Sequence, residues 1–250
     1  MSGHSHWARI RHKKAVVDAR RGRAWSKLAR AVTMAAKAGG GNPNDNPRLR
    51  LAIEKAKAEN MPKDTIEKAV KKGTGELEGE SYEEVLYEGY APGGVAVMCA
   101  AVTDNRNRTS SEIKKLFERG GGNLGSANCV AFMFKQKGLI IVDAEKAAED
   151  VIIQIALEAG AEDVDSSSQV HEITCSPEAF EAVKNAVTEA EIEIESADLS
   201  MIADNSVTLD VSGARKVMRL VDALEEHDDV DAVYSNSNIP NDVLTQLAGD

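Results

Sequence analysis

Lysine and arginine are concentrated at the start of the chain. Residues 1–75 hold 18 Lys and Arg against 6 Asp and Glu, a balance of +12. Each of these cations can neutralise one phosphate of a nucleic acid and release a condensed counterion. The rest of the chain holds 12 basic and 35 acidic side chains, a balance of −23, which opposes indiscriminate binding of polyanions. The asymmetry predicts a polyanion partner for the N-terminal part, and the alternative is a solvated basic face without a partner.

The side chains expected to contact a nucleic acid lie on a basic arm, on the helices after it and on one later loop. Trp7 lies outside any apolar pattern and can either stack on a base or anchor the arm, whereas Trp25 lies on an apolar stripe and is expected in the core. His4, His6 and His12 have no nearby Cys or carboxylate, so phosphate contacts are favoured over a metal site. The predicted nucleic-acid-binding residues are Trp7, Arg9, Arg11, His12, Lys13, Lys14, Arg20, Arg21, Arg23, Lys27, Arg30, Arg48, Arg50, Lys55, Lys57, Lys63, Arg106 and Arg108.

The later loop brings two arginines into an otherwise acidic part of the chain. Residues 103–109 (TDNRNRT) join an expected strand to an expected helix, and Thr109 to Glu112 fit a capping box that would open this helix. Arg106 and Arg108, beside the free amides of a helix start, can hold a phosphate. The alternative is an Asp/Asn turn whose arginines pair with neighbouring acids. The residues alone leave both interpretations open.

The sequence contains short matches to catalytic and cofactor-binding motifs, but their context does not fit those functions. The run GGGNLG at 120–125 has the spacing G-x-G-x-x-G, but it is expected to follow a helix and precede a strand, the reverse of a dinucleotide fingerprint. The match to S-x-x-K at 111–114 lacks its companion motifs. Cys99, Cys129 and Cys175 are far apart, which is typical of a reducing compartment and not of structural zinc. We therefore expect a protein that is not an enzyme, with no cofactor, metal or small-molecule substrate.

Three short helices are expected to position the basic side chains of the N-terminal part. Apolar residues recur with helical spacing from Ala24 to a run of three glycines. Asn46 as N-cap and Pro47 at the first helical position predict the start of a second helix. The third helix is expected to start near Pro62 and to stop at Gly73. The residues before Ala24 lack an apolar stripe and indicate an arm.

After residue 75 the pattern alternates between strands and helices. A first series comprises strands at 82–90, 94–105, 129–134, 206–211 and 230–236, with helices from Thr109 and from Ser212. A second series, inside the first, comprises strands at 138–143, 162–167, 169–175 and 191–197, with helices around 151–155 and from Pro177. Strand-helix-strand repeated twice is the composition of a ferredoxin-like sandwich. We predict an α+β fold with a basic N-terminal arm (1–23), a three-helix basic domain (24–75), a central ferredoxin-like α+β domain (80–136 plus 204–240) and a second one inserted in it (137–203).

Five ordered motifs carry a resemblance to a known family. They are GHSHWARIRHKK, GGGNPNDNPRLRLAIEKAKAENMPKDTIEKAVKKG, YEGYAPGGVAV, TDNRNRT and GGNLG, and the resemblance runs from Gly3 to about Val233. Together they resemble the YebC/PmpR family, which includes the mitochondrial translational activator of cytochrome c oxidase. His6 stands where this family commonly has Lys, and Ala91 where it commonly has Gly. The resemblance implies a basic helical domain, a central α+β domain and an inserted α+β domain.

The family also implies functions, which we treat as hypotheses. The first is a DNA-binding transcriptional regulator in the cytoplasm, because the GHS motif starts at residue 3 and leaves no room for a mitochondrial presequence. The alternative is a ribosome-associated translation factor that contacts rRNA or tRNA and assists translation of proline-containing stretches. Dispersed cations without a recognition element favour structured RNA slightly, whereas the family's naming favours DNA. A third hypothesis is an adaptor that binds proteins through the acidic sheets. No apolar run approaches the ~20 residues of a membrane span, so no membrane partner is expected.

Overall fold

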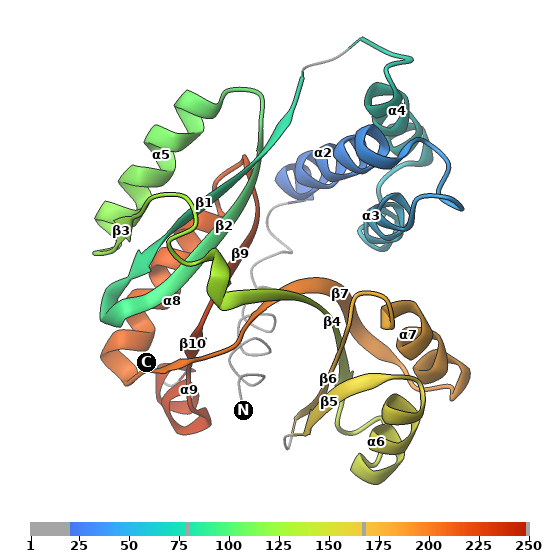
Figure 1. Ribbon diagram of the computed structural model, residues 1–250, viewed down its shortest axis with the longest axis vertical. Helices are drawn as coiled ribbons and strands as arrows, with labels where there is room; N and C mark the ends of the chain where they lie inside the picture. The colour runs from blue at the N-terminus through green and yellow to red at the C-terminus, as the bar shows by residue number, and fades with distance from the viewer. Residues whose placement is uncertain (1–20, 79–80, 167–168, 249–250) are drawn as a thin grey trace.

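The computed structural model describes residues 21–78, 81–166 and 169–248. Figure 1 shows a helical body at the start of the chain, a central sheet flanked by helices, and a second sheet with helices of its own. The segment that forms the second sheet leaves the central body and returns to it. Each of the three bodies has an apolar core. The predicted α+β class is confirmed.

The helical domain contains α2 (Arg21–Gly39), α3 (Pro47–Ala58) and α4 (Lys63–Thr74). Asn46 begins α3 as predicted, because its side-chain oxygen accepts the N–H of Leu49 at 3.0 Å. Its side-chain amide donates to the carbonyl oxygens of Ala35 at 2.8 Å and Gly40 at 2.9 Å. Asn46 is buried, so this single side chain fixes both the end of α2 and the start of α3.

Two boundaries of this domain differ from the prediction. The first helix begins at Arg21, so its first turn takes up residues that were assigned to the arm. Gly73 does not stop α4, which continues to Thr74 and is followed by Gly75 in the left-handed conformation. The reason is packing, since a Cβ on Gly73 would lie 2.3 Å from the carbonyl oxygen of Thr33 in α2. The glycine allows two helices to approach closely.

The central domain is an antiparallel sheet with the strand order β3-β1-β2-β9. Because β1 lies between β2 and β3, the unit β2–α5–β3 is a split β-α-β unit, but its last strand is the short β3 and not the predicted strand at 129–134. The hairpin of β1 and β2, joined by the 3-10 turn η1, lies at the centre of the sheet. The elements are β1 (Glu83–Ala91), η1 (Pro92–Gly94), β2 (Val95–Thr103), α5 (Arg106–Arg119), β3 (Asn123–Leu124), α8 (Val211–Glu225) and β9 (Val230–Ser235).

Helices α5 and α8 cover one face of this sheet and bury their apolar sides against it (Figure 1). Ile113 and Phe117 of α5 and Leu220 and Leu224 of α8 are almost completely buried. A further helix, α9 (Asn241–Ala248), packs on the same core through Val243, beyond the predicted end of the domain at residue 240.

The segment 129–134 is not the strand that its apolar run predicted. It forms the 3-10 turn η2 (Ala131–Met133), and Phe134 begins the next strand. The carboxylate of Glu88 accepts the backbone N–H groups of Asn128, Val130 and Ala131 at 2.6, 2.9 and 2.7 Å. These donors are therefore not available to a sheet ladder.

A second predicted strand, 206–211, is reduced to β8 (Val207–Thr208), which pairs in parallel with β10 (Ser237–Asn238). Asp210 ends it, because its side chain accepts the N–H of Gly213 at 2.7 Å and caps α8.

We expect the Glu88→Gln variant to lose about 2 kcal/mol of the free energy of unfolding. Burial alone would raise the pKa of Glu88, but the three backbone donors outweigh it and the pKa is lowered, so the folded protein favours the charged form. A neutral amide offers these donors one weaker acceptor. Chemical denaturation measures the change, with the exposed Glu83→Gln on the same strand as control. Equal stability of the two variants would contradict an anchoring role for Glu88.

The inserted domain has the chain order β4-α6-β5-β6-α7-β7 and the strand order β5-β6-β4-β7. This is the ferredoxin-like topology that the sequence predicted. Helix α7 begins at Phe180, after a turn, and not at Pro177. The elements are β4 (Phe134–Asp143), α6 (Glu149–Glu158), β5 (Ala161–Ser166), β6 (Val170–Cys175), α7 (Phe180–Glu189) and β7 (Ile194–Ala203). In the described part of the chain, no helix has the length and apolar composition needed to cross a membrane.

Candidate nucleic-acid interface

A buried carboxylate, Asp229, joins the helical domain to the central domain. It lies in the turn between α8 and β9 and is 6% exposed. Arg30 of α2 and Arg108 of α5 each donate to it at 2.8 Å. The hydroxyl of Thr109 donates to it at 2.7 Å. Burial alone would raise the pKa of Asp229, but the hydrogen bonds from Thr109 and Arg108 outweigh it and the pKa falls to about 2.

The loop at 103–109 therefore differs from the predicted capping box. Helix α5 begins at Arg106, and Asn105 is its N-cap, with its side-chain oxygen accepting the N–H of Arg108 at 3.1 Å. Thr109 is fully buried inside the helix and faces Asp229, so it caps nothing. Arg108 also pairs with Asp104 at 2.9 Å, which is the salt-bridged alternative that the sequence left open. Arg106 is exposed and forms no ion pair with a described residue.

Two of the predicted nucleic-acid-binding residues, Arg30 and Lys27 of α2, contact the central domain. Arg30, whose side chain is 15% exposed, donates to the carbonyl oxygen of Asp228 as well as to Asp229. Lys27 donates to the carbonyl oxygen of Glu225 at 2.6 Å, and burial lowers the pKa of its ammonium group. These cations hold domains together and are only partly accessible to a ligand.

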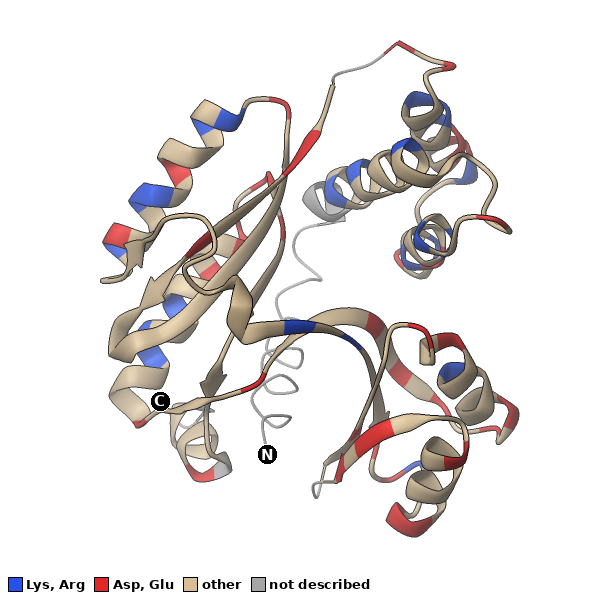
Figure 2. Ribbon diagram, viewed as in Figure 1, with Lys and Arg blue, Asp and Glu red and all other residues tan. Residues whose placement is uncertain are grey.

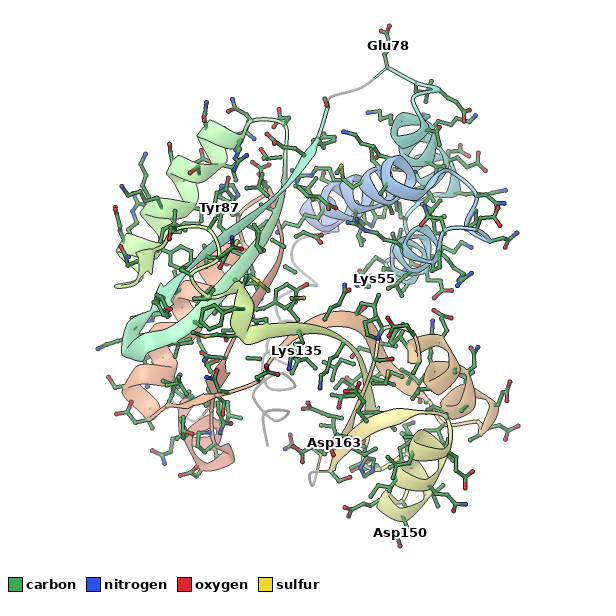
Figure 3. The ribbon with its side chains drawn as sticks, in the orientation of Figure 1. Lys55, Glu78, Tyr87, Lys135, Asp150 and Asp163 are labelled. Carbon is green, nitrogen blue, oxygen red and sulfur yellow. The ribbon has the colours of Figure 1, made fainter. Side chains whose placement is uncertain are left out.

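The cations of α3 divide between internal contacts and solvent. Arg48 pairs with Glu84 of the central domain, and Lys55 pairs with Asp198 of the inserted domain at 2.6 Å. Figure 3 labels Lys55 on the side of the helical domain that faces the inserted domain. Arg50 donates to the carbonyl oxygen of Pro43 at 3.4 Å, and Lys63, at the start of α4, lies 3.6 Å from Glu67. Lys57 is exposed and has no ion pair with a described residue.

The arm residues that the sequence singled out lie outside the described residues. These are Trp7, Arg9, Arg11, His12, Lys13, Lys14 and Arg20. The backbone of Arg21 and Arg23 belongs to the first turn of α2, and their side chains are not described. Their contacts with a nucleic acid stay a prediction. Trp25 packs on the helical core as predicted, and its indole N–H donates to the carbonyl oxygen of Glu59 at 3.0 Å.

Sequence reasoning missed the lysines of α4. Lys68, Lys71 and Lys72 are exposed, and none forms an ion pair with a described residue. Their spacing of three and four residues places them on one side of the helix, opposite the buried Ile66 and Ala69. This spacing is visible in the sequence, but the helix was interpreted only through its apolar stripe.

Of these lysines, Lys71 lines an open groove of about 780 Å³ on the helical domain. Its apolar lining includes Ile53, Met61, Ile66 and Val70. Its charged lining comprises three lysines and two glutamates, Lys57, Lys63, Lys71, Glu67 and Glu76. Apolar side chains beside ammonium groups can take an unstacked base and the phosphates next to it. Figure 2 shows that basic residues occur on all three helices of this domain. Among the described cations of the helical domain, four lysines are exposed and form no ion pair or side-chain hydrogen bond with a described residue, so they are accessible to a ligand. We call these residues, Lys57, Lys68, Lys71 and Lys72, the lysine face.

The structure brings no metal-binding or nucleophilic cluster together within the described residues. No group of three His, Cys, Asp or Glu side chains there has the proximity to hold a metal ion. Burial raises the pKa of Cys99 to about 12 and that of Cys175 to about 11, which disfavours the thiolate form that a nucleophile requires.

The fold and this surface define a class of protein: a basic helical domain joined to two antiparallel sheet domains, one inserted in the other. Family models confirm this class along the chain. The model of the TACO1/YebC N-terminal domain matches residues 5–76, and the model of the TACO1/YebC second and third domains matches residues 82–237. The chain belongs to the TACO1/YebC family.

Whole-length relatives agree with this assignment. A protein of Elusimicrobium minutum named "Probable transcriptional regulatory protein" is 49% identical over 249 residues, covering 99% of this chain and all of the relative. A protein of Geobacter sulfurreducens with a name of the same form is 51% identical over 247 residues, with 99% and 100% covered. The crystal structure of a conserved hypothetical protein from Aquifex aeolicus has a TM-score of 0.84 and 51% identity, covering 94% of this chain and 98% of that one.

Proposed function

We propose that this protein is a DNA-binding transcriptional regulator whose helical domain contacts the phosphate backbone. The names of the relatives support a regulatory role, and they give no support to the ribosome-associated alternative. The observation that carries the proposal is the lysine face, Lys57, Lys68, Lys71 and Lys72, of which Lys57 and Lys71 line an open groove. Unpaired ammonium groups on a helix surface can contact phosphates without first breaking an ion pair within the protein.

The proposed contact is not sequence-specific by itself. Lysines act as point charges and carry no directional code for base edges, so they position the protein on the polymer. The groove adds an apolar lining, which would favour sites where a base is unstacked. The arm residues before α2 are proposed to add further phosphate contacts.

Removing three lysines of the face tests the proposal. We expect Lys68→Gln, Lys71→Gln and Lys72→Gln together to weaken binding of double-stranded DNA about tenfold or more and to flatten the slope of log K against log salt by about 3. The matched control removes the same charge from the inserted domain and the strand that leads into it, through Lys135→Gln, Lys137→Gln and Lys146→Gln, whose side chains pair with local acids. Fluorescence anisotropy at several salt concentrations measures both sets.

An equal loss in both triple variants would mean that only net charge matters, and it would contradict the lysine face. Tighter binding to a structured ribosomal RNA fragment than to DNA at the same salt concentration would favour the ribosome-associated alternative.

A further inference from the structure

The basic residues of the acidic part of the chain are not scattered. Of the 12 Lys and Arg after residue 75, eight lie on α5 and α8. Figure 2 shows blue segments on these two helices of the central domain, while the charged segments of the inserted domain are mostly red. The eight are Arg106, Arg108, Lys114, Lys115, Arg119, Arg215, Lys216 and Arg219.

Pairing separates these cations into two groups. Six of the 12 form ion pairs with acids, namely Arg108, Lys114, Lys135, Lys137, Lys146 and Lys184. Arg215 also takes part in an interaction. Among the described residues after residue 75, the cations without an ion pair are Arg106, Lys115, Arg119, Lys216 and Arg219, and all five are exposed residues of α5 and α8. In a region with a balance of −23, unneutralised cations remain only on this helical layer.

Close packing of the two helices gathers four of them. A Cβ on Gly120, at the end of α5, would lie 2.8 Å from the side chain of Leu220 in α8. Arg119 is the residue before Gly120, and Lys115 lies one helical turn before Arg119 on the same side of α5. On α8, Arg219 directly precedes Leu220 and Lys216 lies one turn before it. The four residues are exposed and lie within five residues, along each helix, of the point where α5 and α8 meet.

Acids pair with cations and a histidine at both ends of the layer, and Lys114 pairs with Glu118 at 3.9 Å near the end of α5. Glu112 of α5 pairs with His227 at 2.9 Å, and Arg108 is held by Asp229. Both contacts join the start of α5 to the turn after α8, so the two helices run antiparallel. Lys115, Arg119, Lys216 and Arg219 have no ion pair with a described residue.

We infer that α5 and α8 form a second binding surface, at which Lys115, Arg119, Lys216 and Arg219 contact the phosphate backbone of a nucleic acid. A protein partner would need apolar anchors at the centre of its contact, and none of the large hydrophobic side chains exposed in the described residues belongs to α5 or α8. A polyanion needs only the cations. Two helices side by side make a broad surface, so the contact adds affinity on any sequence.

This inference rests on the proposed function, because it assumes the same ligand class, but it places the contact in a different domain. One polymer that spans both surfaces binds more tightly than either surface alone allows. With the second surface, the central domain helps to position the protein on the nucleic acid, in addition to supporting the helical domain.

Charge removal at the α5–α8 contact in the full chain tests the inference. The four substitutions Lys115→Gln, Arg119→Gln, Lys216→Gln and Arg219→Gln are combined in one variant, and the probe is double-stranded DNA of arbitrary sequence. We expect affinity to fall about tenfold or more and the slope of log K against log salt to flatten by about 3 to 4. The control variant combines Lys114→Gln, Lys135→Gln, Lys137→Gln and Lys146→Gln, which removes the same charge from paired sites. Its affinity should change less than about threefold, because its cations are already paired.

The outcomes separate this inference from the proposed function. If the variant of Lys68, Lys71 and Lys72 loses affinity and the α5–α8 variant does not, the second surface is overturned while the proposed function stands. If the α5–α8 variant loses affinity and the lysine-face variant does not, the second surface stands alone. Equal losses in the α5–α8 variant and its control, or no binding by the wild-type chain, overturn the inference. A change of oligomeric state by light scattering, with DNA affinity unchanged, would assign the surface to self-association and overturn it as well.

Discussion

An Asp229→Ala variant is expected to lose about 3 kcal/mol of the free energy of unfolding. Removing the carboxylate leaves the guanidinium of Arg30, 15% exposed, with only backbone carbonyl oxygens as acceptors and no compensating charge. It also takes the shortest of its hydrogen bonds from the buried hydroxyl of Thr109. Both groups come from elements that the turn at Asp229 holds together, α2 of the helical domain and α5 of the central domain. Chemical denaturation measures the loss, and limited proteolysis between residues 75 and 83 reports whether the helical domain is released.

The neighbouring Asp228→Ala supplies the control. Asp228 is exposed and contributes only its backbone carbonyl oxygen to Arg30, which the substitution preserves. We expect a change within about 0.5 kcal/mol. If the two variants are equally stable, Asp229 does not join the domains.

The same carboxylate should make stability depend on pH in the acid range. The pKa of Asp229 falls from 3.8 to about 2 on folding, so the charged form is favoured in the folded protein. Its contribution, about 2 kcal/mol, is complete above pH ~4 and is lost as the pH falls toward 2. The wild-type chain should therefore lose stability between these values more steeply than Asp229→Ala. Parallel acid profiles of the two proteins would contradict the assignment.

Elements set by local chemistry could be predicted from the sequence. Asn46 and Pro47 begin α3 because a cap needs only an oxygen three residues before a free N–H. The ferredoxin-like order of the inserted domain follows from alternating strands and helices with short connections.

Elements set by distant partners could not be predicted. Thr109 has the sequence context of a cap, but Asp229 lies 120 residues further on and takes its hydroxyl into the core. The run at 129–134 has the composition of a strand, but Glu88, about 40 residues earlier, takes its N–H groups. In both cases the deciding group is a carboxylate whose position only the tertiary fold reveals.

The candidate site shows the same division. Counting charges correctly placed the cationic part of the chain, but it could not separate paired cations from unpaired ones. Arg30 and Arg108, which the sequence assigned to phosphate contacts, both pair with Asp229, and their contact with a nucleic acid stays a prediction. Lys68 and Lys72 were overlooked because their helix was interpreted only by its buried side.

The Gly73→Ala variant is expected to destabilise the helical domain by about 3 kcal/mol, although alanine favours helix more than glycine does. The added methyl group would lie 2.3 Å from the carbonyl oxygen of Thr33 and 2.7 Å from the Cβ of Ala36. Neither is the flexible end of a long side chain, so α4 must move away from α2. That movement would also break the hydrogen bond from the Thr33 hydroxyl to the carbonyl oxygen of Ala69, now 3.1 Å long.

The adjacent Lys72→Ala separates the two roles of α4. Lys72 is exposed and alanine is the better helix former, so we expect unchanged or slightly higher stability together with weaker DNA binding. Gly73→Ala should instead lower the melting temperature and, because it displaces the lysines at 68, 71 and 72 together, weaken DNA binding as well. Thermal unfolding and anisotropy on the same two preparations distinguish these results. A Gly73→Ala protein with wild-type stability would show that α2 and α4 do not need this close approach. The close approach would then not be what holds the lysine face in place.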